Sequence, residues 1–314
     1  MAEILVDDKT ILITGATGGI GNATALELAT LGARVVVTGR DRDRGEAAVA
    51  ALRERGGNRN VDLLLADLST QAGVRALAAQ FAEHHERLDV LINNAGLAGP
   101  ERRLTADGIE ADLAVNALAP FLLTRLLLPR LRASPSARIV NVAGGEPGQI
   151  HLDNLQAERS FRGLETYSHT KTIQMALSYE LAQRLRDSSF TVNVCYPGRA
   201  STAMTQSVTP HMLPVGMREA WPAFERMARP DQGRSAAEAA RSSLYLATSP
   251  ELQGVTGQYV DSRCQRADWP TAVLDPNLRR QLWAAAEQLT HITDQQTASD
   301  TATQTARRNA DGKQ

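Results

Sequence analysis

The chain has 314 residues, of which 43% are hydrophobic and 22% charged, and its formal net charge is −1. This size fits one large α/β domain or two small ones, and the balanced charge excludes a general attraction to nucleic acid or to an anionic membrane surface. Acidic residues precede the first apolar run, so no signal peptide is expected. No apolar run approaches the roughly 20 residues of a membrane span. Two cysteines make no disulfide framework, and we expect a cytoplasmic protein.

Short β-rich runs alternate with helical stretches. Continuous apolar or β-branched runs, typical of parallel strands buried on both faces, predict strands at Thr10–Thr14, Arg34–Thr38, Val61–Ala66, Val90–Asn93, Arg138–Val142, Thr191–Cys195 and Gln258–Val260. Helices are predicted at Ile20–Leu31, Arg44–Glu54, Gln71–Glu86, Gly108–Leu131 and Leu164–Leu185. This alternation indicates βαβ units with right-handed crossovers. The expected fold class is α/β, a single doubly wound Rossmann-type domain with a parallel sheet and helices on both faces.

We expect this domain to occupy residues 1–292 and residues 293–314 to form a polar, disordered tail. The segment of about 199–232 is predicted to be a substrate lid, because it offers an adaptable apolar surface made of Met204, Met212, Leu213, Met217, Trp221, Phe224 and Met227. The alternative is an amphipathic helix that closes the core. A lid of this kind favours a large, lipophilic, polycyclic or polyketide-like ketone or alcohol as substrate, in secondary metabolism.

A glycine-rich loop joins the first strand to the first helix. Glycines allow the sharp turn and the close approach to a pyrophosphate, and the N-terminus of the helix behind them attracts anions. The pattern therefore predicts a dinucleotide-binding loop, although a plain glycine turn is the alternative. Its candidate binding residues are Gly15, Thr17, Gly18, Gly19, Ile20 and Gly21.

Arginine follows the second predicted strand, where an acidic residue would favour NAD. Arg40 stands in this place, and Arg42 and Arg44 come close behind. A guanidinium group suits a 2′-phosphate through paired charged hydrogen bonds, so the sequence favours NADP(H) as cofactor. The alternative is a solvated basic turn whose charge Asp41 and Asp43 balance.

Tyr167 and Lys171 are four residues apart and share one face of a predicted helix. A phenol with a pKa near 10 is a poor acid or base at neutral pH, and a nearby ammonium group would lower that pKa. The pair could then exchange a proton with a substrate oxygen. By itself this spacing is common on helices, so its weight comes from the other motifs.

Taken in order, Thr14–Gly21, Asn93-Asn94-Ala95-Gly96, Asn116, Tyr167-x-x-x-Lys171 and Pro197-Gly198 make the chain resemble the short-chain dehydrogenase/reductase family over about residues 9–290. The runs Gly39–Asp41, Val115–Leu118, Tyr167–Lys171 and Leu282-Trp283 look most like its retinol-dehydrogenase-like branch. That branch interconverts lipophilic carbonyls and alcohols with NADP(H). The resemblance implies an oxidoreductase with catalytic residues Tyr167, Lys171 and Asn116, of which Asn116 would hold a water.

The same resemblance implies further contacts to the cofactor. Besides the glycine loop, Arg40 and Lys171, the implied cofactor-binding residues are Asp67 and Leu68 at the adenine, Asn94, Ala95 and Gly96 at the ribose, and Pro197, Gly198 and Thr202 at the nicotinamide. Simple structural roles stay open for each of them, such as bracing of strands by Asn93 and Asn94. In the family, helices equivalent to Gly108–Leu131 and Leu164–Leu185 often pair between subunits, so a homo-oligomer is expected, unless the segment with Trp283 caps the fold.

One position departs from the family pattern. Gly144 stands where the family has a serine whose hydroxyl orients the substrate carbonyl. The glycine could make room for a bulky substrate or mark lost redox chemistry, and Ser160, Thr166 or Glu146 could compensate for the missing hydroxyl. Two alternatives to an oxidoreductase therefore stay open, a non-redox catalyst such as a cyclase, epimerase or dehydratase, and a redox-inactive binding protein. The histidines His151, His169 and His211 show no metal-binding spacing, so no metal is expected.

Overall fold

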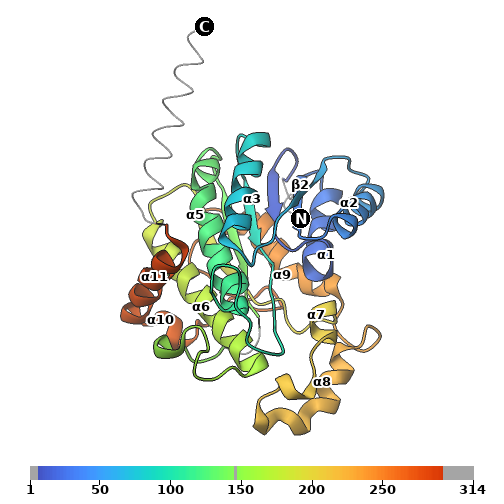
Figure 1. Cartoon of the computed structure of the whole chain (residues 1–314). Helices are drawn as coiled ribbons and strands as arrows, with labels where there is room; N and C mark the ends of the chain where they lie inside the picture. The colour runs from blue at the N-terminus through green and yellow to red at the C-terminus, as the bar shows by residue number, and fades with distance from the viewer. Residues whose placement is uncertain (1–5, 145–146, 293–314) are drawn as a thin grey trace.

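A seven-stranded parallel sheet forms the centre of the computed structural model, which describes residues 6–144 and 147–292 (Figure 1). The strand order is β3-β2-β1-β4-β5-β6-β7, which confirms the predicted fold class. The strands are β1 (Thr10–Ile13), β2 (Arg34–Gly39), β3 (Val61–Leu65), β4 (Val90–Asn93), β5 (Arg138–Val142), β6 (Thr191–Cys195) and β7 (Tyr259–Val260). Each predicted strand is present, with its ends within one residue of the prediction.

Helices lie on both faces of this sheet. The longer ones are α1 (Gly19–Thr30), α2 (Arg42–Gly56), α3 (Gln71–His84), α5 (Ala119–Arg132), α6 (Gly163–Arg184), α8 (Trp221–Ala228), α9 (Ala236–Thr248) and α11 (Pro276–Thr290). Short α-helical pieces are α4 (Ala111–Leu113), α7 (Ala203–Gln206) and α10 (Thr271–Leu274). A π-helical turn occupies Ala114–Leu118, and 3₁₀ turns occupy Leu152–Asn154, Pro210–Met212, Val215–Ala220 and Pro250–Leu252.

The sheet is buried on both faces, which explains its continuous apolar strands. In β1, Ile11 and Ile13 face one core with α1 and α9, while Leu12 faces the other core with α3, α5 and α6. This alternation follows from the two-residue repeat of a strand. Helix α9 was not predicted from the sequence, although it closes the first of these cores. In Figure 1, α7 and α8 lie at the lower right, below this layered body.

The predicted helix Gly108–Leu131 is interrupted in the structure. Its first turns are α4 and the π-helical turn Ala114–Leu118, and α5 then continues to Arg132. π-helical turns are rare in proteins, and those that do occur are frequently found at functional sites. This one places Asn116, which is fully buried, between the loop after β4 and helix α6.

By length and composition alone, the stretch Ala111–Arg132 could cross a membrane. The sequence analysis, in contrast, predicts no apolar run of membrane-spanning length. In the structure, 89% of its most apolar window is buried inside the protein. Its apolar side chains pack against α3, α6 and the sheet. Here the stretch acts as a core helix.

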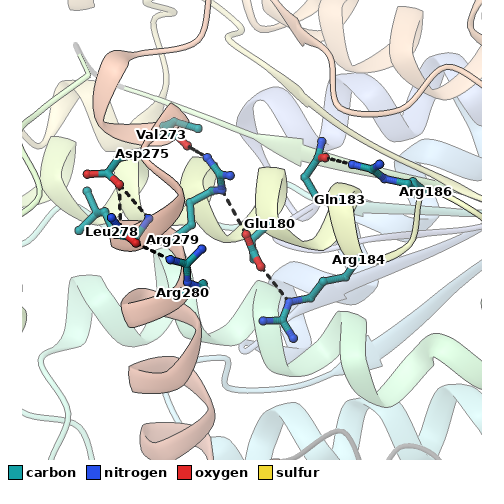
Figure 2. A network of polar contacts seen from close by, with 10 residues as sticks. Glu180, Gln183, Arg184, Arg186, Val273, Asp275, Leu278, Arg279 and Arg280 are labelled. Atoms are coloured by element: carbon teal, nitrogen blue, oxygen red, sulfur yellow. Dashed lines mark hydrogen bonds and ion pairs between the residues drawn. The ribbon is translucent and has the colours of Figure 1, made fainter.

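Helix α11 covers the outer side of α5 and α6 through charged and aromatic contacts. Figure 2 shows Glu180 of α6 between two arginines, and its carboxylate accepts from Arg279 Nε at 3.1 Å and from Arg184 Nε at 3.0 Å. Trp283 of α11 is 3% exposed and packs edge-on against Phe121 of α5. These contacts occupy part of the helical surface from which we expected self-association, so the homo-oligomer stays a prediction.

A buried carboxylate braces the amino-terminal ends of the strands, opposite the ends that carry the motifs. Asp89 is 1% exposed and accepts hydrogen bonds from the backbone N of Thr10 at 2.9 Å and from Ser134 Oγ at 2.6 Å. It also accepts one from Arg87 Nε at 3.1 Å. We expect Asp89→Ala to lower the free energy of unfolding by about 3 kcal/mol in urea denaturation, because it leaves buried donors without an acceptor.

The matched control for Asp89→Ala is Glu46→Ala on α2. Glu46 forms an i, i+4 ion pair with Arg42, and its side chain is 61% exposed. This change should cost less than about 0.5 kcal/mol. Equal losses in the two variants would contradict the role of Asp89.

Candidate active site

One large cavity opens at the carboxyl ends of the strands. Its volume is about 1270 Å³, and loops that follow β1 to β6 line it. In a doubly wound sheet, a ligand crevice lies at this edge, where the strand order reverses. Here the reversal lies between β1 and β4. Of the candidate site residues, those that line the cavity are Gly15, Thr17, Gly18, Gly19, Ile20, Arg40, Asp67, Leu68, Asn94, Ala95, Gly96, Tyr167, Lys171, Pro197, Gly198 and Thr202.

The glycine-rich loop has the backbone that its sequence predicts. Gly15 and Gly19 have φ angles of +65° and +57°, which residues other than glycine rarely adopt. A Cβ atom on Gly18 would meet nothing within 4 Å, so this face of the loop is open. No side chain caps the N-terminus of α1, and its first N–H groups are therefore free to bind an anion.

Asn94 holds this loop against the strand on the other side of the reversal. Its Nδ2 donates to the backbone O of Thr14 at 2.9 Å and to that of Gly15 at 3.1 Å. A Cβ atom on Gly21 would lie 2.4 Å from this same nitrogen. Gly21 does not line the cavity, and its hydrogen atom leaves room for Asn94.

Two arginines reach the cavity where the second strand ends. Arg40 and Arg44 both line it, and neither has an ion-pair partner among the described residues. Asp41 instead caps α2 by accepting from the backbone N of Arg44 at 2.9 Å, and Arg42 turns to Glu46 at 3.4 Å. The basic turn is therefore only partly balanced by its own acidic neighbours, and Arg40 and Arg44 give the cavity positive charge.

Tyr167 and Lys171 lie one helical turn apart on α6 and are both buried. Lys171 Nζ donates to the backbone O of Val142 at 2.7 Å and to Gln174 Oε1 at 2.8 Å. Burial lowers the pKa of Lys171 to about 7. The pKa of Tyr167 is raised, first by burial and then by the charges of Tyr196 and Asp112. The expected lowering of the tyrosine pKa by the lysine is not found, since burial, Tyr196 and Asp112 all raise it.

Gly144 lies against the hydroxyl of Tyr167. A Cβ atom at position 144 would stand 2.1 Å from Tyr167 Oη and 3.1 Å from its Cζ. Any residue with a side chain would therefore displace the phenol. Of the residues considered as substitutes for the serine hydroxyl, Ser160 and Thr166 line the cavity, and Glu146 lies outside the described residues.

Asn116 lies behind the cavity wall and does not line it. Its Oδ1 accepts from the backbone N of Leu97 at 2.7 Å, and its Nδ2 donates to the O of Leu97 at 2.8 Å. The same Nδ2 donates to Thr170 Oγ1 at 2.9 Å. Asn116 thus braces the loop after β4 against α6, while its expected role in holding a water stays a prediction.

The segment predicted as a lid forms one wall of the cavity. Met204, Leu213, Met217, Phe224 and Met227 line the cavity from this segment. Met212 is buried behind the wall instead, and Trp221 stacks on Phe224 with ring centroids 5.8 Å apart. The segment starts at the glycine loop, because a Cβ atom on Gly19 would lie 3.5 Å from Thr202 Cγ2.

Sequence reasoning missed several groups of the site. Tyr196, directly before Pro197-Gly198, lines the cavity, and so do His151 and His169. His169 Nε2 accepts from the backbone N of His151 at 3.2 Å, and burial lowers the pKa of His169 to about 4. Gln174, one turn beyond Lys171, was missed as well. Its spacing on α6 was the available signal, and no single motif marks the others. Among residues 6–144 and 147–292, no three His, Cys, Asp or Glu side chains gather as a metal site.

The sequence of the chain was compared with those of known protein families and proteins. Residues 9–213 match the short chain dehydrogenase family. Human retinol dehydrogenase 14 is 37% identical over 300 residues, which cover 90% of this chain and 86% of that protein.

Solved structures agree with the fold. The crystal structure of an uncharacterized protein from Mycobacterium paratuberculosis is 29% identical, covers 93% of this chain and 97% of its own, and superposes with a TM-score of 0.70. The NADP complex of Pseudomonas aeruginosa RhlG is also 29% identical, covers 83% of this chain and 97% of its own, and has a TM-score of 0.64. The expected resemblance to retinol dehydrogenases is confirmed, and the chain belongs to the short chain dehydrogenase family.

Proposed function

We propose that the protein is an NADP(H)-dependent oxidoreductase that interconverts a carbonyl and an alcohol on a bulky lipophilic substrate. The observation that carries this proposal is that Tyr167 and Lys171 share one cavity with an open glycine loop and two unpaired arginines. A dinucleotide and a second ligand both need space, and about 1270 Å³ is larger than a typical pocket for one small molecule.

The cavity fits NADP(H) at two places. The open face of Gly18 and the free N-terminus of α1 suit a pyrophosphate. Arg40 and Arg44 suit the 2′-phosphate that distinguishes NADP(H) from NAD(H). The structural relative from Pseudomonas aeruginosa, which is solved with NADP, supports the same choice. When bound, this cofactor would supply or accept the hydride.

Tyr167 is placed to act as the proton donor to a carbonyl oxygen. Its raised pKa means that the phenol carries its proton at neutral pH, so it is an acid in the direction of reduction. Lys171 is held by Val142 and Gln174, and one of its three donors stays available for a ribose hydroxyl. Asn116 keeps the loop after β4 in place beside both residues.

The walls beyond Tyr167 favour a lipophilic substrate. Leu213, Met217 and Phe224 approach from the lid, and Leu97 and Leu104 from the loop after β4. Methionine and leucine side chains adapt to irregular apolar shapes. The retinol dehydrogenases among the relatives, by their names, act on a lipophilic alcohol. A role in secondary metabolism and a cytoplasmic location stay predictions.

The first prediction concerns cofactor choice. The wild-type protein should bind NADPH at least tenfold more tightly than NADH, because Arg40 and Arg44 would pair with a 2′-phosphate that NADH lacks. Fluorescence titration measures both dissociation constants. Arg40→Asp should weaken NADPH binding about tenfold and spare NADH, whereas Arg42→Asp, whose side chain turns to Glu46, should change the ratio little. Equal wild-type affinities would contradict the assignment.

The second prediction concerns Tyr167. Tyr167→Phe keeps the ring and removes only the hydroxyl, so cofactor binding and the melting temperature should stay unchanged. Reduction of all-trans-retinal or decanal with NADPH should fall by about 10²–10⁴-fold, the effect of losing a positioned acid. Full activity in this variant would refute the assignment.

The reaction type has its own readout in the same assay. With NADPH deuterated at the transferred position, deuterium should appear on the carbinol carbon of the product. A rearranged or dehydrated product without deuterium and without NADPH consumption would instead favour the non-redox alternative.

The third prediction concerns the buried lysine. Since the pKa of Lys171 is lowered to about 7 in the fold, the unfolded chain binds more protons at this residue between pH 7 and about 10. The free energy of unfolding therefore rises with pH in this window. Relative to Lys171→Met, the cofactor-free wild type should gain about 2 kcal/mol between pH 7 and pH 9 in urea denaturation.

The neighbouring Cys195, whose pKa burial raises to about 11, lowers the free energy of unfolding as the pH approaches 9, but both proteins keep this residue, so its contribution cancels in the comparison. Parallel stability curves for wild type and Lys171→Met would show that the lysine titrates outside this window.

A further inference from the structure

Tyr196 leaves the sheet next to the place where β5 ends. The parallel register pairs Val142 of β5 with Cys195 of β6, and the backbone N of Ala143 donates to the O of Cys195 at 2.8 Å. Ala143 and Tyr196, which follow these two strands, therefore lie side by side, and Gly144 comes one residue after Ala143. Tyr196 is half-buried and lines the cavity.

The Tyr196 side chain belongs to the same side of the sheet as Tyr167. Cys195 packs toward α9, where its Sγ lies 3.5 Å from Ser243 Oγ. Successive residues of a strand point to opposite faces, so Tyr196 turns toward α6. The charge of Tyr196 also helps to raise the pKa of Tyr167, and this electrostatic effect requires the two phenols to lie close together.

The end of β5 itself offers no hydroxyl to a ligand. Gly144 has no side chain, and Tyr167 Oη fills the space in which its Cβ would stand, 2.1 Å away. A carbonyl oxygen has two lone pairs and can accept from two donors at once. With Tyr167 as one donor, there is room on the same oxygen for a second donor from the adjacent strand end.

We propose that Tyr196 is a second catalytic tyrosine, whose hydroxyl donates a hydrogen bond to the carbonyl oxygen of the substrate beside Tyr167. This inference rests on the proposed carbonyl–alcohol reaction. In reduction, a hydride that bound NADPH would give up, leaving NADP+, forms the new C–H bond, and the electron pair of the C=O π bond takes the proton of Tyr167. The phenolate of Tyr167 regains a proton from solvent, while Tyr196 keeps its own. A donor fixed at the developing oxyanion stabilises the transition state more than the ground state.

The test compares four single variants on whichever of all-trans-retinal and decanal the wild type reduces faster with NADPH. Tyr196→Phe should lower kcat by about 10–100-fold and change KM less than threefold, because the lost bond strengthens in the transition state. NADPH affinity and melting temperature should stay at wild-type values. Tyr245→Phe on α9 is the matched control, and its kcat should not change.

Gly144→Ser tests the geometry from the other strand. If the second hydroxyl comes from Tyr196, the new side chain only displaces Tyr167, so kcat should fall, and the double variant with Tyr196→Phe should not recover. A binding readout avoids turnover altogether: decanoate, an unreactive carboxylate, should bind the NADP complex of Tyr196→Phe more weakly than that of the wild type in calorimetry.

Unchanged kcat and unchanged decanoate binding in Tyr196→Phe would overturn this inference, and so would a kcat above the wild-type value in Gly144→Ser, because it would show that the wild-type site lacks the second donor. If Tyr167→Phe is inactive in the same experiment, the proposed function survives that result. Reduction of neither aldehyde by the wild type would count against the proposed function, and the inference would fall with it.

Discussion

The close approach of two loops across the reversal of strand order is the constraint on which the site depends. The loop after β1 and the loop after β4 meet so tightly that a Cβ atom on Gly15 would stand 2.9 Å from Ala95 Cα. Asn94 ties the two loops together through the carbonyl groups of Thr14 and Gly15. A backbone packed in this way needs glycine on one side and a short polar side chain on the other. It leaves the first N–H groups of α1 facing an open cavity, which no bulkier loop would allow.

Everything else in the site is arranged around this contact. Parallel strands deliver their following loops to one edge of the sheet, so residues far apart in the sequence, such as Arg40, Gly144 and Tyr196, surround a single cavity. The π-helical turn carries Asn116 to the back of the loop after β4, and Thr202 brings the start of the segment 199–232 onto Gly19. This segment thus contacts the glycine loop directly, and both of them line the cavity.

The sequence predicted the sheet and the lining of the cavity well, because both follow from local patterns. Buried parallel strands are continuous apolar runs, and the glycine loop has its own spacing. Packing between distant segments could not be predicted in the same way. The interruption at Ala114–Leu118 arises where Asn116 must reach both Leu97 and Thr170. The i, i+4 spacing placed Tyr167 and Lys171 together, but it gave the wrong direction for the tyrosine pKa, since burial depends on the whole cavity.

Burial shifts the pKa values of Tyr167 and Lys171 in opposite directions, and this has a consequence for the chemistry. Burial disfavours the charged form of each, so the pKa of Tyr167 rises while that of Lys171 falls to about 7. The resting pair near neutral pH is therefore a protonated phenol beside an amine that is only partly charged. Such a pair can give a proton to a substrate oxygen without first losing one to solvent. An anionic cofactor would add negative charge near Lys171, which favours its ammonium form, and this ammonium would then stabilise the phenolate left on Tyr167 after the transfer. Cofactor binding and proton transfer would in this way be coupled through Lys171, which Gln174 and Val142 hold in place.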